Sequence, residues 1–299
     1  MSQRKCLSWP ALISLAPLLL TSFSCGSGKP PIIVGSKNDP EQLLLGEIIA
    51  QQIEKKMPDR KVIRKLGLGN TMMMATAIIA GEVDLFPEDA GTALVAILKE
   101  EPIADGTVAF ERVRSELQRE YQVTSLNPLG YSHQYVFVAQ DPPIKGLEGL
   151  NMSDAIATKR SFKLSVSHDF LERKDGFQML MTRYQPSMAK VPQVLESDKM
   201  YDGLKTGQVE WAAGFNTDPW LDQPGFRIMS DDMGIFTKQP AFIAARKKLL
   251  DTFPELRPAL EMLSGKFTDE SMRKLSAEIA IKKRSPVEVA KEFLASAGL

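Results

Sequence analysis

The chain has 299 residues, its 37 basic and 37 acidic side chains balance, and 43% of its residues are hydrophobic. This length allows one large domain or two smaller ones, and the apolar content is ordinary for a globular protein. A nucleic-acid-binding surface needs clustered basic residues. The balanced charge therefore argues against a nucleic-acid partner.

The N-terminus predicts an export signal. Basic residues precede an apolar run at 7–23, which ends close to Cys25. A positive start and a short apolar core are typical of a secretory signal peptide. The cysteine after this run indicates a lipoprotein-type signal at 1–25, in which Cys25 is lipidated and becomes the first mature residue. Since Ser22 stands where lipoprotein signals have an aliphatic residue, a plain signal peptide that leaves Cys25 as a free thiol is the alternative.

The cysteine content supports lipidation and excludes an internal disulfide. Cys6, the other cysteine, lies inside the predicted signal, so the mature chain has no pair to oxidise. A free thiol would be a liability in an oxidising compartment. No other apolar run is long enough to span a bilayer. We therefore expect a soluble domain in the periplasm or at the outer face of the cytoplasmic membrane, tethered by acyl chains.

The first part of the mature chain alternates predicted strands and helices. Apolar, β-branched runs predict strands at residues 32–37, 60–66 and 83–86. Asp39 and Pro40 predict a helix start, because Asp39 can accept from free amides and proline fits the first turn. A second helix is predicted from Asn70 or Thr71 to about Gly81. This alternation predicts an α/β fold with largely parallel strands.

The remaining chain repeats this α/β pattern. A helix is predicted at about 107–120 and another after His168. Further strands are predicted at residues 121–126, 134–140, 162–167, 209–215 and 226–230. A last strand enters a helix within 242–250, and the tail at 254–299 predicts three helices that pack back on the first domain. Two α/β sets, with the chain crossing and returning, predict two lobes with a ligand cleft between them.

The sequence patterns of catalytic and metal-binding sites are incomplete in this chain. Residues 67–72 lack the third glycine of a dinucleotide-binding loop. Neither His133 nor His168 has a cysteine or second histidine at metal-ligand spacing. Glu88 and Asp89 are adjacent, so we expect their side chains to diverge, whereas a general acid–base pair must converge on one substrate. We expect no catalysis, metal or cofactor.

Several stretches of the mature chain follow a recognisable order and spacing. They are residues 34–48, 65–71, 81–98, 170–176 and 204–218. Together they resemble the substrate-binding components of ABC transporters for glycine betaine, carnitine, choline and similar osmoprotectants, and the resemblance covers about 31–298. It implies an α/β, type II periplasmic-binding-protein fold with two α/β lobes and a ligand cleft between them. The corresponding lobes are 26–131 plus 236–299 and 132–235.

The resemblance implies three residues for the carboxylate side of a ligand. A Gly-Ser-Lys or Gly-Ser-Gln motif ends the family's first strand, and Lys37 holds its last position. The family's Tyr-Pro-Glu-Tyr-Thr-Gly-Thr stretch corresponds to 86–92, in which Thr92 keeps a ligand contact. The arginine of Phe-Leu-Glu-Arg-x-Asp-Gly is Arg173, which grips the ligand carboxylate in some members. A surface position for Lys37 or Arg173, and helix capping by Thr92, are the structural alternatives.

The resemblance also implies an aromatic cage for a cation, and this chain departs from it. Tyr135 and Phe215 match cage positions, but Asp89 replaces a cage tyrosine and Gln239 falls at the last cage position. A quaternary ammonium has no N–H and is held by aromatic faces. The expected ligand is therefore a glycine betaine-, choline- or carnitine-like compound, or an amino-acid-like zwitterion whose N–H groups meet Asp89 and Gln239.

The implied activity is solute capture rather than chemistry. The open form binds the ligand between its lobes, closes, and delivers it to an ABC permease in the cytoplasmic membrane. The expected partners are thus a small molecule, the permease and, through the lipid anchor, the membrane. Two other classes stay open: a sensor lipoprotein that no longer serves transport, and an enzyme, against which the export signal argues.

Overall fold

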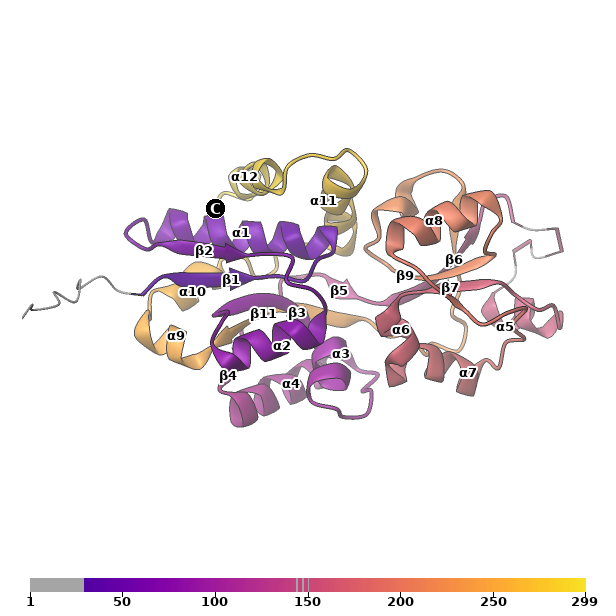
Figure 1. Ribbon diagram of the computed structural model, residues 1–299, viewed down its shortest axis with the longest axis horizontal. Coiled ribbons are helices and arrows are strands. Elements are labelled where there is room, and N and C mark those ends of the chain that lie inside the picture. Colours follow the sequence, from indigo (N-terminus) through magenta and orange to yellow (C-terminus); the bar gives the residue numbers. More distant parts are fainter. Residues whose placement is uncertain (1–29, 144, 147, 150) are drawn as a thin grey trace, which may run out of the picture. The chain divides into compact units, whose positions relative to one another are not determined.

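The strands of the protein form two sheets, each with helices packed around it (Figure 1). The computed structural model describes residues 30–143, 145–146, 148–149 and 151–299. The predicted signal peptide and Cys25 lie outside the described residues. Residues 31–299 belong to one compact unit. Within the described ranges, no helix combines the length and the apolar character needed to cross a membrane.

The first sheet has the strand order β2-β1-β3-β11-β4, with β5 paired to β11. Its strands are β1 (Ile32–Gly35), β2 (Val62–Lys65), β3 (Leu85–Asp89), β4 (Val123–Ser125), β5 (Ser132–His133) and β11 (Gln239–Arg246). β1 pairs in parallel with β2 and β3. β11 comes back from the second sheet and runs antiparallel to β3, β4 and β5.

The second sheet has the order β10-β6-β9-β7-β8. Its strands are β6 (Tyr135–Gln140), β7 (Leu164–Val166), β8 (Gln193–Val194), β9 (Trp211–Phe215) and β10 (Phe226–Met229). β7 is parallel to β8 and β9, but β6 is antiparallel to β9 and β10. The first three strands, on which the prediction of largely parallel strands rested, do pair in parallel, but the prediction does not hold for the two sheets as a whole. Both sheets are mixed because the strands that carry the chain across and back, β6 and β11, run against their neighbours.

The first helix begins where the sequence predicts, and the second both begins and ends there. Helix α1 (Pro40–Lys56) is capped by Asp39, whose carboxylate accepts from a backbone N–H of the first turn at 2.9 Å. Helix α2 (Thr71–Ala80) is capped by Asn70 and ends at Gly81, which adopts the left-handed conformation at φ 78°. A glycine reaches this conformation without the steric cost of a Cβ atom. Local side-chain chemistry thus sets the bounds of both helices.

The other helices fill the connections between strands and form the C-terminal tail. They are α3 (Ala90–Thr92), the π-helix η1 (Ala93–Ile97), α4 (Gly106–Tyr121), α5 (Met152–Ala157), α6 (His168–Glu172), the π-helical turn η2 (Lys174–Gln178), α7 (Met179–Arg183), α8 (Ser197–Thr206), the 3-10 helix η3 (Pro219–Asp222), α9 (Lys247–Thr252), α10 (Leu256–Glu261), α11 (Asp269–Ala280) and α12 (Pro286–Ser296). Helices α10, α11 and α12 contact α1. The expected packing of the tail on the first part of the chain is confirmed.

Each sheet has its own hydrophobic core. One face of the first sheet packs against α1 and the tail helices, and its other face against α2 and α4 (Figure 1). The second sheet buries Phe137, Phe162 and Trp211 in a separate cluster. Burial of such large side chains contributes most of the stability of an α/β layer. The two sheets are therefore packed by separate hydrophobic clusters within this unit.

Candidate functional site

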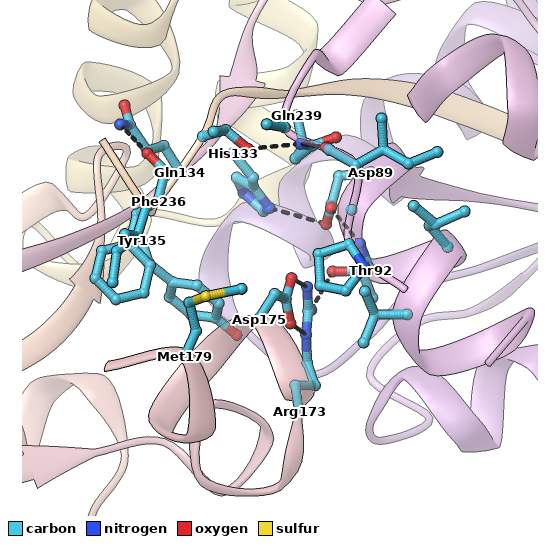
Figure 2. Close-up of a pocket in the computed structure, with 18 of the residues that line it drawn as sticks. Asp89, Thr92, His133, Gln134, Tyr135, Arg173, Asp175, Met179, Phe236 and Gln239 are labelled. Carbon is cyan, nitrogen blue, oxygen red and sulfur yellow. Dashed lines mark hydrogen bonds and ion pairs between the residues drawn. The ribbon is translucent and has the colours of Figure 1, made fainter. Parts of the chain in front are cut away.

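The residues singled out in the sequence gather around two adjoining cavities. The smaller cavity has a volume of about 280 Å³ (Figure 2), and its lining includes Asp89, Thr92, Tyr135, Arg173, Phe215 and Gln239. The larger cavity, of about 700 Å³, includes Lys37 in its lining. The two cavities share Asp89, Thr92, His133, Arg173 and Phe215. The shared residues form a polar and aromatic wall between the cavities.

Asp89 is fixed at the end of a strand that is longer than predicted. The predicted strand ended at Phe86, whereas β3 continues to Asp89 because β11 pairs along it and places Ala241 opposite Asp89. The Asp89 side chain is buried and caps α3, since its Oδ1 accepts from the backbone N–H of Thr92 at 2.8 Å. One carboxylate oxygen of Asp89 is thus committed to the backbone.

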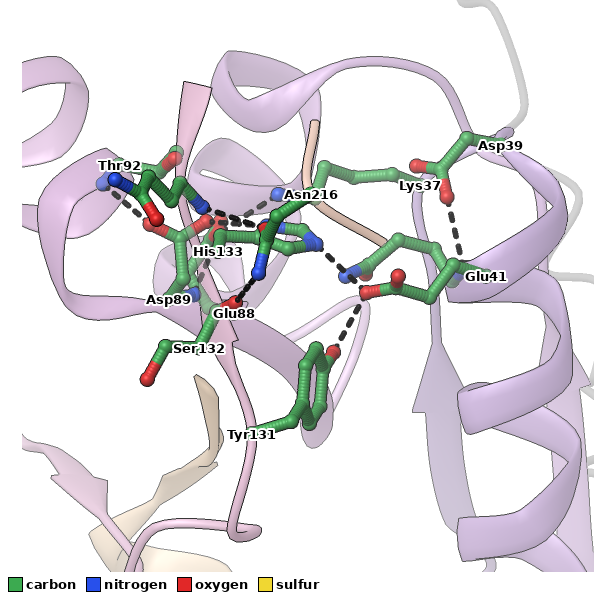
Figure 3. A network of polar contacts seen from close by, with 12 residues as sticks. Lys37, Asp39, Glu41, Glu88, Asp89, Thr92, Tyr131, Ser132, His133 and Asn216 are labelled. Atoms are coloured by element: carbon green, nitrogen blue, oxygen red, sulfur yellow. Dashed lines mark hydrogen bonds and ion pairs between the residues drawn. The ribbon is translucent and has the colours of Figure 1, made fainter. Parts of the chain in front are cut away.

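The other oxygen of Asp89 faces a histidine. His133 Nδ1 lies 3.2 Å from Asp89 Oδ2, and His133 Nε2 lies 2.7 Å from Oε1 of Glu41 (Figure 3). The hydroxyl of Tyr131 donates to the same Glu41 oxygen at 2.6 Å. An imidazole with a carboxylate at each nitrogen donates from both and carries a positive charge. Asp89 therefore has a cationic partner within the protein itself.

The pKa shifts agree with this charge assignment. Burial lowers the pKa of His133, but the Glu41 and Asp89 carboxylates outweigh it and hold the pKa well above its usual value. Burial raises the pKa of Asp89, and the facing His133 outweighs that cost and lowers the pKa below its usual value. The pKa of Glu41 is lowered in the same way. The group is an imidazolium between two carboxylates at neutral pH.

Arg173 is held from both sides of the site. Its Nε and Nη2 donate to the two oxygens of Asp175 at 2.9 and 2.6 Å, and its Nη1 donates to Thr92 Oγ1 (Figure 2). A Cβ atom on Gly176 would lie 2.1 Å from the carbonyl oxygen of Phe170, so glycine is needed for the turn that positions Asp175. Each terminal nitrogen of Arg173 keeps a second N–H, which suits an incoming carboxylate.

The two aromatic residues matched from the family lie side by side. Tyr135 and Phe215 are cross-strand neighbours on β6 and β9, and their rings stack at 4.7 Å and 22°. Phe215 also stacks with His133 at 4.8 Å and 21°, and the Arg173 guanidinium lies 5.5 Å from the Tyr135 ring centre. The aromatic faces are thus already in contact with cations of the protein.

The Gln239 side chain lines the smaller cavity, and its amide oxygen is buried. Its Nε2 donates to the carbonyl oxygen of Ile103 at 3.1 Å and to Thr237 Oγ1 at 2.9 Å. Because a carbonyl oxygen only accepts, this contact fixes the orientation of the amide. Oε1 of Gln239 then has no hydrogen-bond partner among the described residues. Gly91 allows this packing, since a Cβ atom there would lie 2.7 Å from Gln239 Cγ.

Lys37 is engaged by the residue next to Asp89. Its Nζ lies 2.6 Å from Oε1 of Glu88, whose side chain is fully buried. The same Glu88 oxygen accepts from the backbone N–H of Asp89 at 3.0 Å. Burial lowers the pKa of Lys37, but Glu88 and Asp89 outweigh it and raise the pKa above its usual value. Lys37 lines the larger cavity as a paired cation, and its ligand contact stays a prediction.

Sequence reasoning did not predict the roles of His133, Glu41 and Asp175. In the sequence, His133 stands out only by its lack of metal-ligand spacing, although its place two residues before Tyr135 could have indicated that it lies near the aromatic residues. Glu41 lies in the first turn of the helix predicted to start at Asp39 and Pro40. Nothing in the spacing of residues 41, 89 and 133 connects them, because the strand order of the first sheet brings them together.

Comparisons with known proteins agree with the resemblance in the sequence. Residues 30–296 match the family model described as the substrate binding domain of ABC-type glycine betaine transport system. The chain is 30% identical over 270 residues to the ergothioneine transport permease/ergothioneine binding protein EgtU of Helicobacter pylori (strain G27), which covers 90% of this chain and 48% of that protein. The chain therefore spans about half the length of that relative. It is 28% identical over 289 residues to the carnitine transport binding protein OpuCC of Listeria monocytogenes, covering 95% of this chain and 93% of that protein.

Solved structures share the fold. A glycine betaine/carnitine/choline ABC transporter structure has a TM-score of 0.76 at 23% identity and covers 89% of this chain and 98% of its own. The apo YehZ structure from Escherichia coli has a TM-score of 0.67 at 22% identity, with coverages of 90% and 99%. This likeness establishes the fold alone. The predicted α/β, type II periplasmic-binding-protein fold is confirmed.

Proposed function

The chain belongs to the family of substrate-binding domains of ABC-type glycine betaine transport systems, and we propose that its ligand is a betaine-type zwitterion that also carries an N–H or O–H donor. The protein captures this solute outside the cytoplasmic membrane and passes it to an ABC permease. We further infer that the protein is anchored to the membrane by a lipid on Cys25. We also infer that one lobe comprises residues 26–131 and 236–299 and the other residues 132–235, with boundaries close to where β5 leads into β6 and where the chain returns to β11.

The observation that carries the proposal is the unpaired acceptor of Gln239 in a pocket with separate cationic and anionic groups. The remaining N–H groups of Arg173 suit a ligand carboxylate, while Tyr135 lines the smaller cavity as one of the two aromatic residues matched to the cation cage. A trimethylammonium group has no N–H, so it cannot satisfy Gln239 Oε1. Leaving such a buried acceptor unpaired is unfavourable by about 1–3 kcal/mol. A donor elsewhere on the ligand removes that penalty.

The solutes in the names of two relatives meet these requirements. Ergothioneine, named for the Helicobacter pylori relative, is a trimethylated zwitterion with ring N–H groups. Carnitine, named for the Listeria monocytogenes relative, adds a hydroxyl to the betaine pattern. Glycine betaine has the carboxylate and the methylated cation but no donor. We therefore expect this chain to bind ergothioneine-like or carnitine-like solutes more tightly than glycine betaine.

Isothermal titration calorimetry tests this preference directly. Purified mature protein is titrated with ergothioneine, carnitine, glycine betaine, choline and histidine. We expect ergothioneine or carnitine to bind most tightly. Gln239→Leu should lower the affinity for that ligand about tenfold, which corresponds to about 1.4 kcal/mol. The affinity for glycine betaine should stay within twofold of the wild-type value.

The control for this experiment is Gln208→Leu, an exposed glutamine outside both cavities, which should leave all affinities unchanged. The proposal is contradicted if glycine betaine binds most tightly and Gln239→Leu affects no ligand. Tightest binding of histidine, which has no methyl groups, would instead show that the pocket selects amino acids.

A further inference from the structure

His133 stands where the site would otherwise receive a ligand cation. Its ring lines both cavities, and its side chain is only 13% exposed. It stacks on Phe215, one of the two aromatic residues expected to hold a methylated cation, at 4.8 Å. Its Nδ1 contacts Asp89 at 3.2 Å, the residue that replaces a cage tyrosine. The His133 side chain thus contacts both groups that would attract a ligand cation, the Phe215 ring and the Asp89 carboxylate.

The charged groups around His133 come from several elements. The N-terminal turn of α1 contributes Glu41 in direct contact, with Asp39 nearby, and β3 contributes Asp89. From beyond β9, Asp218 also interacts with the imidazolium. Tyr131 donates to Glu41 and does not itself contact the ring through a hydrogen bond. These groups favour a permanent positive charge on His133.

Asp89 has little capacity left for a second cation. Its Oδ1 accepts from the backbone of Thr92, and its Oδ2 faces His133. The nearby guanidinium of Arg173 is likewise paired with Asp175. A ligand that carries only a cation would therefore find both oxygens of Asp89 engaged and would lie next to an imidazolium and a guanidinium. A zwitterion adds no net charge and brings its own carboxylate to Arg173.

We propose that His133 is a specificity-determining residue of this binding site, an inference that rests on the proposed function. Its imidazolium fills the place beside Asp89 and Phe215 that a lone cation needs. The site consequently accepts solutes that pair their cation with a carboxylate and rejects cations without one. Choline and carnitine form the matched probe pair, because both have a trimethylammonium group and a hydroxyl and only carnitine has a carboxylate.

The test is calorimetry with carnitine and choline on the wild type and His133→Gln. Glutamine removes the positive charge and keeps a polar side chain near Glu41 and Asp89. We expect choline to bind at least tenfold more tightly to the variant, and carnitine to change less than threefold. Arg257→Gln is the control, since it also replaces a cation by glutamine at a residue outside both cavities, whose side chain is 45% exposed. It should leave both affinities within twofold.

A second variant gives an answer if His133→Gln does not fold. Asp89→Asn keeps the imidazolium of His133 and removes one of the two carboxylates that balance its charge. The affinity for choline should therefore fall at least tenfold more than the affinity for carnitine. The inference is overturned if the ratio of choline to carnitine affinity in these variants stays within twofold of the wild-type ratio. Failure of the wild type to bind any zwitterion is a different result, because it contradicts the proposed function on which the inference rests.

Discussion

Lys37 and Glu88 form a buried ion pair, in which each charge depends on the other. Lys37 Nζ lies 2.6 Å from Glu88 Oε1, with side chains that are 12% and 0% exposed. Removing one partner of a buried pair leaves a charge without compensation, whereas removing both can be nearly neutral. The pair therefore makes a prediction about stability that does not depend on any ligand.

Lys37→Met is expected to lower the free energy of unfolding by about 3–5 kcal/mol, because Glu88 stays buried without a cation. The double variant Lys37→Met/Glu88→Gln should recover most of this loss. Urea unfolding of the mature protein measures both values. Lys247→Met, which removes an exposed helical pair with Asp251, should change stability by no more than about 0.5 kcal/mol. Equal losses in the single and double variants would contradict the account.

Asp218 gives the site region a dependence on pH. It lies just after β9, where its Oδ2 accepts from the Tyr201 hydroxyl and from the backbone N–H of Phe215, each at 3.0 Å. Burial raises the pKa of Asp218 from 3.8 to about 6, although these hydrogen bonds lower it. Since the folded state binds this proton more tightly than the unfolded state, the contribution to stability is present at low pH and is lost as pH rises through about 6.

Asp218→Asn should remove this contribution to the pH dependence, because asparagine keeps an acceptor and does not titrate. We expect the free energy of unfolding of the wild type to decrease, relative to the variant, by about 2 kcal/mol between pH 4 and pH 6. Denaturant unfolding at several pH values gives the difference curve. A flat difference curve over that range would show that Asp218 titrates as an ordinary carboxylate.

At the scale of elements, the turn η2 holds Arg173, the proposed carboxylate-binding residue, in place. Gly176 sits inside this turn at φ −105° and ψ −118°, with the carbonyl of Phe170 packed against its α-carbon. Asp175, the preceding residue, accepts from Nε and Nη2 along one edge of the Arg173 guanidinium. The turn therefore links backbone packing to the geometry of the guanidinium.

Gly176→Ala is expected to destabilise the protein by about 1–3 kcal/mol through this overlap and to weaken zwitterion binding, since Asp175 and Arg173 must shift. Gly207→Asn is the control, because Gly207 ends α8 in a left-handed conformation with open space around it, which asparagine tolerates. Calorimetry and thermal unfolding of both variants provide the comparison. Wild-type affinity in Gly176→Ala would show that the turn does not position Arg173.

Elements set by local chemistry were predictable from the sequence, and those set by pairing were not. The caps at Asp39 and Asn70 define α1 and α2 because each satisfies backbone amides of its own helix. The end of β3 was placed too early, since its continuation to Asp89 depends on β11, which arrives from far along the chain. Strand direction failed for the same reason.

At the scale of the whole molecule, the site is assembled from segments that are distant in sequence. The predicted residues lie around two cavities that share one wall, which a motif comparison could foresee. The chain of contacts from Asp175 through Arg173, Thr92, Asp89 and His133 to Glu41 could not be foreseen. It exists only after the two sheets have formed and the chain has crossed between them. The sequence therefore predicted residues that lie around the same cavities, but it left their charge pairing undetermined.

The central claim is that this protein recognises a zwitterion through separate groups for its carboxylate and its cation. The most direct measurement is calorimetric titration of carnitine and choline into the wild type and Arg173→Gln. Arg173→Gln removes the charged donors assigned to the ligand carboxylate, so carnitine affinity should fall about 10- to 100-fold, or about 1.4 to 2.7 kcal/mol. The affinity for choline, which has no carboxylate, should not fall. Equal weakening of the two ligands, or unchanged carnitine binding, would contradict this account of recognition.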